Sequence, residues 1–380
     1  MPFATETVVW LIRHGASTFN LEGRCQGCCD EPALTEEGRD AARLSGYRLG
    51  RSGIWAVISS PLRRAAETAR EIVAVVRHGG GKVGLETDAR LREIELPQWE
   101  GLPVGEIPRR FHDQFLTWRS HPALLAMESP SGEAEFPVRK LYSAVRDLWR
   151  DLLSTHAGKS ILLVTHSGTA RALITTALGM DEDCFHSFQQ SNCGISRLRF
   201  ASSGTEAYLE LLNDTSHLDD RLPKLKEGRT GVQLLLIPAG IPHLEDLRRL
   251  SKILSPITVE TVLVGGFAAR NSASLIFPGR SQKRVEQVSK NSLATRLRQI
   301  LETCDSNALR HIAVVAPPDS LQLVLRERFA LPGSGRRSLV LTTPWISAVH
   351  CPGRGVPPVL QAVNAFEKKS ELVGVSVCEC

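Results

Sequence analysis

Short apolar runs alternate with amphipathic segments from the start of the chain. Residues 8–13 are apolar enough for a buried strand, and Thr35 is a good N-cap for a helix over 36–49. The first half continues with strands expected at 55–60, 159–165, 194–200 and 207–212, and with helices expected at 61–77, 137–156 and 167–178. This alternation favours a three-layer α/β fold, in which a parallel-rich sheet is covered by helices on both faces.

The pattern stops at residues 213–230, which are polar, charged and interrupted by proline and glycine, and then restarts. Strands are expected at 231–237, 259–264, 311–316 and 338–342, and helices at 243–254, 284–304 and 319–328. The 380 residues also exceed what one compact domain usually holds. The sequence therefore predicts two α/β domains, 1–212 and 231–370, joined by a linker at 213–230 and followed by a loose tail at 371–380.

Composition and charge indicate an ordinary globular protein. The formal net charge of +5 is spread along the chain, without a lysine run or an arginine cluster among aromatics, so no nucleic-acid partner is expected. No apolar stretch approaches the roughly 18 residues that span a bilayer, so no membrane partner is expected either. The N-terminus has the pattern of a first strand and not of a signal peptide, which predicts a cytoplasmic location.

The chain has nine cysteines at irregular spacing, which favours reduced thiols over a disulfide framework. Cys25, Cys28 and Cys29 form the cluster "CQGCC", which invites a metal interpretation. A structural zinc site needs a second pair of ligands at matched spacing, and the terminal "CEC" does not supply it. We therefore favour small residues in a loop and expect no metal.

Polar side chains follow three of the expected strands. They are Arg13-His14-Gly15, the arginines of "SSPLRR", and Thr165-His166-Ser167-Gly168. Ligands of parallel α/β sheets gather at the carboxyl ends of the strands. If these strands are neighbours, two imidazoles and two or three guanidiniums converge, and such a cluster attracts phosphate. The helix that Gly168 opens adds N–H groups that favour an anion.

A histidine among cations stays neutral and can act as a nucleophile. Phosphoryl transfer also needs an acid for the departing oxygen, and "LREIELPQWEGL" supplies Glu93 and Glu95. Each signal alone is weak, because a histidine after a strand is more often structural, Arg63-Arg64 fits a solvated helix face, and Glu93 could pair with a neighbouring arginine. The joint pattern is much more specific.

The motifs "RHG", "SSPLRRAAETA", "LREIELPQWEG" and "VTHSGTARALI", in this order, resemble the histidine phosphatase superfamily, also called phosphoglycerate mutase-like, over about residues 7–212. The resemblance implies that His14 becomes phosphorylated, that Glu93 is the general acid and base, and that no metal or cofactor is needed. It also implies a phosphate pocket made by Arg13, Arg64 and His166 and lined by Ser17, Asn20, Ser167 and Gly168. Ala16 and Ser167 depart from the usual residues of the family, but neither replaces a reacting group.

The segments "LREIELPQWEGL", "FQQSNCGISRLRF" and "LELLNDTSHL" are similar to two-domain phosphatases of cyanobacteria and chloroplasts, of the 2-carboxy-D-arabinitol-1-phosphate phosphatase-like and phosphoserine phosphatase-like kinds. This implies hydrolysis of a small phosphorylated metabolite. A phosphoglycerate-type mutase and a non-catalytic binder of phosphorylated ligands are the alternatives. Arg109 and Arg119, in the segment 102–136, favour a substrate with a carboxylate beside its phosphate.

In such two-domain proteins the second half repeats the first, and the strands can be aligned by eye. Pro238-Ala239 then stands where Arg13-His14 stands, Ala269 at the place of Arg64, and Pro317 at the place of His166. The alignment predicts a degenerate copy that lacks the catalytic residues and that braces the first domain, forms a homodimer surface or binds a ligand. An unrelated small α/β domain is the alternative.

Overall fold

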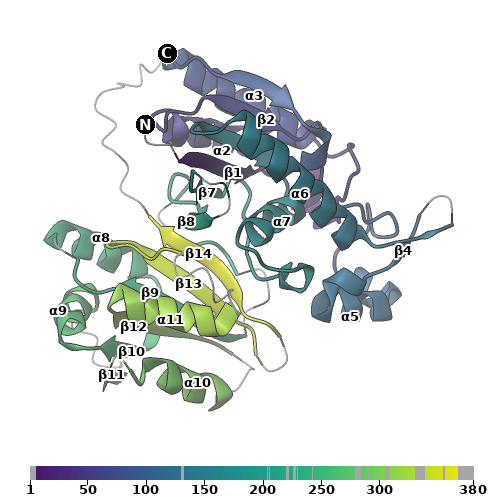
Figure 1. The fold of residues 1–380 in the computed structure, drawn as a ribbon. Coiled ribbons are helices and arrows are strands. Elements are labelled where there is room, and N and C mark those ends of the chain that lie inside the picture. Colours follow the sequence, from purple (N-terminus) through teal and green to yellow (C-terminus); the bar gives the residue numbers. More distant parts are fainter. Residues whose placement is uncertain are drawn as a thin grey trace.

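The computed structural model describes residues 6–366 except 130–131, 203, 205, 220–221, 226–227, 229, 242, 279–283, 290, 304–307, 330–338 and 354–355. A 12-stranded sheet runs through both halves of the chain, in the order β11-β10-β12-β9-β13-β14-β8-β7-β1-β6-β2-β3 (Figure 1). A separate hairpin pairs β4, Met127–Glu128, with β5, Ala134–Glu135.

The first half of the sheet contains six strands. They are β1 (Thr7–Arg13), β2 (Ala56–Ser59), β3 (Gly84–Thr87), β6 (Ser160–Thr165), β7 (Ile195–Phe200) and β8 (Ala207–Asp214). All the strands expected here are confirmed, and β3 is an addition. Because β6 pairs in parallel with both β1 and β2, the carboxyl ends of these three strands lie side by side at one edge. The polar residues that follow them are thereby brought together.

The helices of the first half are α1 (Thr18–Glu22), α2 (Glu36–Leu49), α3 (Arg63–His78), α4 (Ile107–Arg110), α5 (His112–Ser120), α6 (Pro137–Thr155) and α7 (Ser167–Ala177). Thr35 is confirmed as the N-cap of α2, and its side chain accepts the Gly38 N–H at 3.0 Å. The expectation that Pro61 lies in the first turn of α3 is wrong. The Leu62 N–H donates to Ser60 Oγ at 3.2 Å, which holds residues 60–62 in a turn, and the helix begins at Arg63.

Successive side chains of β1 point to opposite faces of the sheet. Val9 and Leu11 pack in the core beneath α6 and α7, whereas Trp10 and Ile12 pack in the core beneath α2 and α3. Helices therefore cover both faces, and the three-layer α/β architecture expected for this half is confirmed.

The second half contributes β9 (Gly231–Pro238), β10 (Val259–Gly265), β11 (Arg284–Val288), β12 (Leu309–Ala316), β13 (Ile346–Cys351) and β14 (Val359–Ala365), with α8 (Leu244–Leu254), α9 (Phe267–Ile276), α10 (Leu293–Thr303) and α11 (Pro318–Phe329). The helix expected at 284–304 is partly wrong, since "RVEQV" pairs as a strand with β10 and the helix begins only at Leu293. The strand expected at 338–342 is also misplaced. In its described part Leu339 makes an isolated bridge with Leu209, and the strand lies at 346–351. The tail at 371–380 lies outside the described residues.

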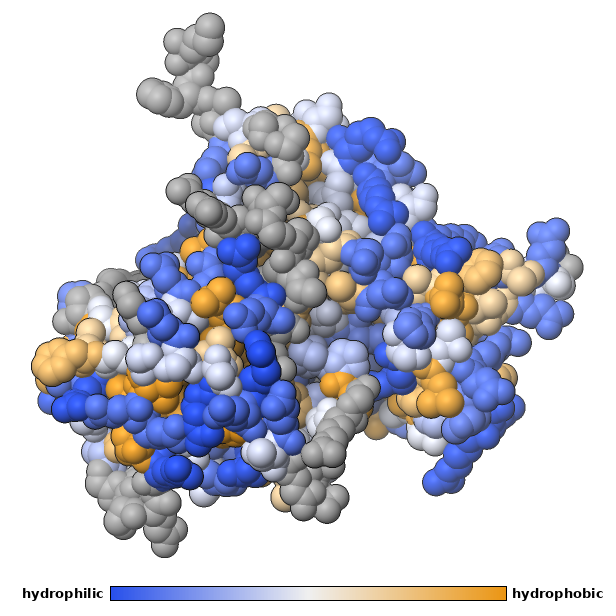
Figure 2. Space-filling model, turned by 60° about the horizontal axis from the view of Figure 1, so that its bottom comes forward, coloured by the Kyte–Doolittle hydropathy of each residue, from blue (hydrophilic) through white to orange (hydrophobic). Residues whose placement is uncertain are grey.

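The two halves meet where β14 pairs antiparallel with β8, through Val363 and Leu212. On one face of the sheet the core beneath α6 and α7 continues into the core beneath α10 and α11. Figure 2 shows hydrophilic and hydrophobic residues interspersed over one side of the molecule, with the hydrophobic ones in small separate patches. Within the part of the chain that is described, no helix has the length and apolar character to cross a membrane.

Candidate active site

Two histidines face each other at the carboxyl edge of the first half of the sheet. His14 follows β1 and His166 follows β6, and their ring centroids lie 5.1 Å apart with the planes inclined by 57°. Both side chains are buried. The pairing of β1 with β6 in register, with Arg13 opposite Thr165, fixes this approach through the backbone.

The hydrogen bond of His14 Nδ1 determines which ring nitrogen carries the lone pair. Nδ1 lies 2.7 Å from the carbonyl oxygen of Gly15, which can only accept, so Nδ1 carries the proton. Nε2 therefore holds the lone pair, as a nucleophile requires. The turn is tightly packed, because a Cβ on Gly15 would lie 2.4 Å from the Gly38 carbonyl oxygen. A side chain at position 15 would thus displace the backbone that orients His14.

Hydrogen bonds to backbone carbonyl groups orient two buried arginines. Arg13 Nη1 donates to Gln190 O at 3.0 Å, and Arg64 donates to Cys29 O at 2.7 Å and to Gly27 O at 2.8 Å. The Nε atoms of both are buried and have no partner among the described residues. Burial lowers the pKa of Arg13 to about 10 and also lowers that of Arg64, yet both stay charged at neutral pH. Neither guanidinium makes an ion pair with a described residue, although the charge of Glu93 raises the pKa of both, so the two arginines together can bind an anion.

His166 is held neutral in this environment. Its Nε2 lies 2.8 Å from Ser60 Oγ, while its buried Nδ1 has no partner among the described residues. Burial lowers the pKa of His166 well below its ordinary value, and the charges of Arg64, His14 and Arg13 lower it further. A neutral imidazole can donate one hydrogen bond to phosphate without repelling the neighbouring guanidiniums.

We expect acid to destabilise the protein through His166. The unfolded chain protonates this ring below about pH 6.5, but the folded chain does not, so stability falls as pH decreases through that value. Between about pH 7.5 and pH 5.5 the loss from one such group is about 1.4 kcal/mol. Urea unfolding at both pH values should show a correspondingly smaller loss for His166→Asn. Equal losses in the wild type and the variant would contradict the assignment, and His78→Asn, at an exposed position, is the control.

The Glu93 side chain lies against the N-terminal end of α7, opposite the cationic groups. Its carboxylate accepts the Gly168 N–H at 3.1 Å, the Thr169 N–H at 3.1 Å and the Ile94 N–H at 2.9 Å. A side chain at position 168 would displace the Glu93 carboxylate, since a Cβ there would lie 2.6 Å from Glu93 Oε1. These N–H donors fit an ionised carboxylate, the form that can take a proton from water.

The cysteine cluster has a definite place beside these groups. The carbonyls of Gly27 and Cys29 orient Arg64, and Cys28 Sγ lies 2.8 Å from the Glu93 carbonyl oxygen. Burial raises the pKa of Cys25 to about 12 and that of Cys28 to about 11, so these thiols stay protonated. In the described ranges, no group of three or more His, Cys, Asp or Glu residues could hold a metal.

The other residues singled out from sequence lie at different distances from this cluster. Ser17 caps α1, and Asn20 Oδ1 accepts from Ser17 N at 3.2 Å and from Asn192 Nδ2 at 3.0 Å. Ser167 is the first residue of α7. Arg109 is exposed on α4, and Arg119 is half-buried on α5, where its charge helps to lower the pKa of His186.

Sequence reasoning missed the roles of several residues that complete the site. The Gln190 carbonyl and the Asn192 amide hold Arg13 and the backbone of His14, and Ser60 contacts His166. Their motifs, "FQQSN" and "SSPLRR", were visible, but nothing in them assigns these roles. Arg92 is exposed beside Glu93, contacts the Cys28 thiol and lowers the pKa of His166 by its charge, without an ion pair to any described residue.

Comparison with known proteins gives a consistent set of relatives. The family model of the histidine phosphatase superfamily (branch 1) matches residues 9–215. A probable 2-carboxy-D-arabinitol-1-phosphatase of Arabidopsis thaliana is 38% identical over 64% of this chain and 50% of its own length. Phosphoserine phosphatase 1 of Hydrogenobacter thermophilus is 29% identical over 55% of this chain and 93% of its own.

A probable phosphoglycerate mutase GpmB of Yersinia pestis is 31% identical over 58% of this chain and 97% of its own length. The solved structure of Bacillus stearothermophilus YhfR is 29% identical and superposes with a TM-score of 0.49, covering 56% of this chain and all of its own. The chain thus spans about half the length of the Arabidopsis relative and nearly all of the shorter bacterial ones.

Proposed function

Because the chain belongs to the histidine phosphatase superfamily, we propose that it is a metal-independent phosphomonoesterase that hydrolyses a small phosphorylated metabolite through a phosphohistidine on His14. The observation that carries the proposal is the hydrogen bond from His14 Nδ1 to Gly15 O at 2.7 Å, which leaves the Nε2 lone pair among cationic groups. Arg13 and Arg64 supply the positive charge that a transferring phosphoryl group needs.

In the first step, His14 Nε2 attacks phosphorus in line with the ester oxygen. The Nε2–phosphorus bond forms while the phosphorus–oxygen bond to the leaving group breaks, and Glu93 donates its proton to the departing oxygen. This proton is the one that Glu93 takes from water in the preceding turnover. Arg13, Arg64 and His166 stabilise the charge on the remaining phosphoryl oxygens.

In the second step, Glu93 takes a proton from a water molecule, whose oxygen attacks phosphorus and displaces His14. Phosphate leaves with one oxygen from water, and Glu93 regains the proton that the next turnover needs. The N–H bonds that Glu93 accepts from Gly168, Thr169 and Ile94 hold it in the basic form for this step.

Mutase activity is the second candidate, favoured by the similarity to a protein named as a probable phosphoglycerate mutase. A phosphate-release screen over phosphoserine, phosphoglycolate, 3-phosphoglycerate and sugar phosphates tests the proposal. We expect phosphate from at least one of them and no isomerisation of 3-phosphoglycerate. Isomerisation faster than phosphate release would establish the mutase. The absence of both activities would favour a non-catalytic binder of phosphorylated ligands.

The free thiols among the described cysteines support a cytoplasmic location for the enzyme.

We propose further that the substrate carries a carboxylate beside its phosphate. Relatives are named for carboxyarabinitol phosphate and phosphoserine, which both have one. Three arginines are candidates to bind it: Arg92, Arg109 and Arg119. Arg92 is favoured, because its charge acts on His166 and it lines a pocket together with Cys28 and Glu93. The other cations lining that pocket are matched, Arg90 by Asp88 and Lys140 by Glu95.

Arg92→Gln should raise KM for phosphoserine about tenfold more than KM for p-nitrophenyl phosphate, which has no carboxylate. This is the expected loss of one charge-assisted hydrogen bond. Arg109→Gln and Arg119→Gln, measured in the same way, show whether the helices α4 and α5 contribute. Equal KM changes for both substrates in all three variants would exclude a carboxylate subsite at these arginines.

We propose that residues 231–370 are a degenerate copy of the first domain. The expected boundary of that domain is 212, but β8 continues to Asp214, so the joining segment 213–230 begins only after Asp214. Support comes from the strand order. The seam is the place where β8 pairs with β14, and counted outward from it the strands correspond one for one: β8-β7-β1-β6-β2-β3 on one side and β14-β13-β9-β12-β10-β11 on the other. Parallel and antiparallel pairings match as well, and so does register. Ile12 pairs with Val164 in β6, and Ile237 pairs with Val315 in β12.

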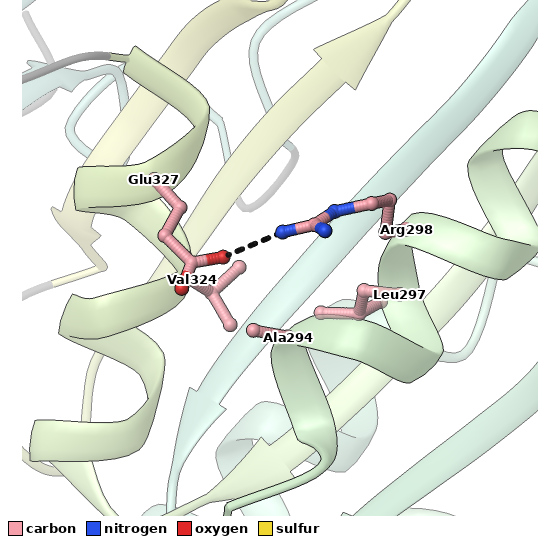
Figure 3. Close-up of a pocket in the computed structure, with 5 residues that line it drawn as sticks. All are labelled: Ala294, Leu297, Arg298, Val324 and Glu327. Atoms are coloured by element: carbon pink, nitrogen blue, oxygen red, sulfur yellow. Dashed lines mark ion pairs between the residues drawn. The ribbon is translucent and has the colours of Figure 1, made fainter.

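In this correspondence the backbone is kept while the reacting side chains are absent. The N–H of His14 donates to Thr165 O at 2.9 Å, and the N–H of Ala239 donates to Ala316 O at 2.8 Å. A described pocket of this half lies between α10 and α11 and not at the carboxyl edge. It is lined by Ala294, Leu297, Arg298, Val324 and Glu327. The two charged residues, Arg298 and Glu327, form an ion pair with each other at 3.6 Å (Figure 3). We therefore assign no phosphate chemistry to the second half.

A further inference from the structure

We propose that Asn213 is a positioning residue through which the second half holds the phosphate-binding residues of the first. The inference rests on the proposed function. It concerns the seam between β8 and β14, where the two halves are related by a pseudo-twofold arrangement like that of a symmetric dimer.

Asn213 and Asn364 occupy equivalent places at this seam. Each follows a paired residue, Leu212 in β8 and Val363 in β14. Both are buried, and both have a left-handed backbone, with φ of 52° for Asn213 and 51° for Asn364. Asparagine tolerates this conformation better than most residues. The backbone N–H of each donates to the serine of the neighbouring strand, Asn213 to Ser196 and Asn364 to Ser347.

Each side-chain amide joins a loop of its own half to the opposite half. Asn213 Oδ1 accepts the Ser191 N–H at 2.7 Å, and its Nδ2 donates to the Gln361 carbonyl in β14 at 2.8 Å. Asn364 Oδ1 accepts the Thr342 N–H at 3.0 Å, and its Nδ2 donates to the Glu210 carbonyl in β8 at 2.8 Å. Asn364 Nδ2 also donates to the Val340 carbonyl of its own half at 2.5 Å, so the side-chain contacts of the two residues are similar, with one more hydrogen bond at Asn364.

The two loops differ in the residues that they contact in turn. On the first side, the Gln190 carbonyl accepts from Arg13 at 3.0 Å, and Asn192 Nδ2 donates to His14 O at 3.0 Å. The same loop is tied to β14 by the Gln189 N–H, which donates to Leu360 O at 2.9 Å. Residues 189–192 thus lie between the second half and the catalytic groups.

On the second side, Asn364 holds Thr342 in the segment before β13. The start of β13 lies beside the end of β9, where Pro238 and Ala239 replace the arginine and the histidine. Disorder of the segment around Thr342 would therefore displace no reacting group. The pseudo-symmetry thus supplies a matched pair, in which one asparagine acts on the phosphate pocket and the other bears only on stability.

The test compares Asn213→Gly with Asn364→Gly in the full chain. Glycine keeps the left-handed backbone at low cost, so each change removes mainly the side-chain bonds. We expect both variants to lose stability in urea, Asn364→Gly at least as much as Asn213→Gly, because Asn364 makes one more hydrogen bond. Only Asn213→Gly should weaken competitive inhibition by inorganic phosphate, by at least about tenfold, and lower kcat/KM for p-nitrophenyl phosphate by as much or more. Asn364→Gly should stay within about twofold of the wild type.

Equal changes in phosphate inhibition in the two variants would overturn the inference, because a merely structural role predicts them. The pair Asn213→Ser and Asn364→Ser, which shortens the side chain without adding a charge, decides the question if a glycine variant fails to fold. The activity of the wild type separates this inference from the proposed function. A wild type that releases no phosphate contradicts the function, whereas an active wild type with equal variants contradicts only the role of Asn213.

Discussion

Replacing His14 by alanine is expected to lower kcat for phosphate release by at least about a thousandfold. Neither His166 nor the arginines can replace it as the nucleophile, since His166 Nε2 is engaged with Ser60, its Nδ1 is buried, and the arginines are cationic. Steady-state kinetics with p-nitrophenyl phosphate measures the loss. His78→Ala, at an exposed position at the end of α3, should leave kcat unchanged.

The His14→Ala variant should still bind inorganic phosphate, because Arg13, Arg64 and His166 remain. The guanidiniums of Arg13 and Arg64 are held by the backbone carbonyls of Gln190, Gly27 and Cys29, and not by the His14 side chain. Retained binding with lost turnover separates loss of the nucleophile from collapse of the pocket. A variant that releases phosphate at the wild-type rate would remove His14 from the mechanism.

Replacing Glu93 by glutamine is expected to affect substrates according to their leaving groups. An alkoxide such as that of phosphoserine needs a proton to depart, and its kcat should fall by roughly 10²- to 10⁴-fold. The p-nitrophenolate anion leaves without one, so the first step with p-nitrophenyl phosphate should stay fast. The second step lacks its base, and the phosphohistidine should accumulate. Stopped-flow absorbance should then show a burst of about one p-nitrophenol per active site.

Glu95→Gln is the matched control for this experiment. Glu95 is two residues away and exposed, and it pairs with Lys140 at 2.7 Å. We expect this variant to behave like the wild type with both substrates. Equal losses for phosphoserine and p-nitrophenyl phosphate in Glu93→Gln, without a burst, would show that Glu93 only supports the start of α7.

The chain pattern predicts those parts of the fold that depend on local features. The apolar run of β1, the Thr35 cap and the arginine and histidines after the strands are all visible in sequence. Parallel pairing then brings His14 next to His166 without further information. The strand β11 was mistaken for helix because its five residues gain their pairing from β10, a partner remote in sequence.

The contacts that orient the site could not be predicted in the same way. Arg13 and Arg64 are aimed by backbone carbonyls, and any residue type supplies a carbonyl. Asn213 shows the same limit, since its role depends on meeting β14 about 150 residues later in the chain. Sequence indicates which groups can react, whereas the structure is needed to see what holds them in place.

Rapid-quench trapping of the phosphorylated enzyme tests the mechanism most directly. The wild type is mixed with p-nitrophenyl phosphate, stopped in alkali, digested and analysed by mass spectrometry. We predict one phosphoryl group per chain on His14, formed and lost at least as fast as kcat, increased in Glu93→Gln and absent in His14→Ala. Steady release of phosphate with His14 unmodified throughout, or with the phosphoryl group on another residue, would contradict the proposed mechanism.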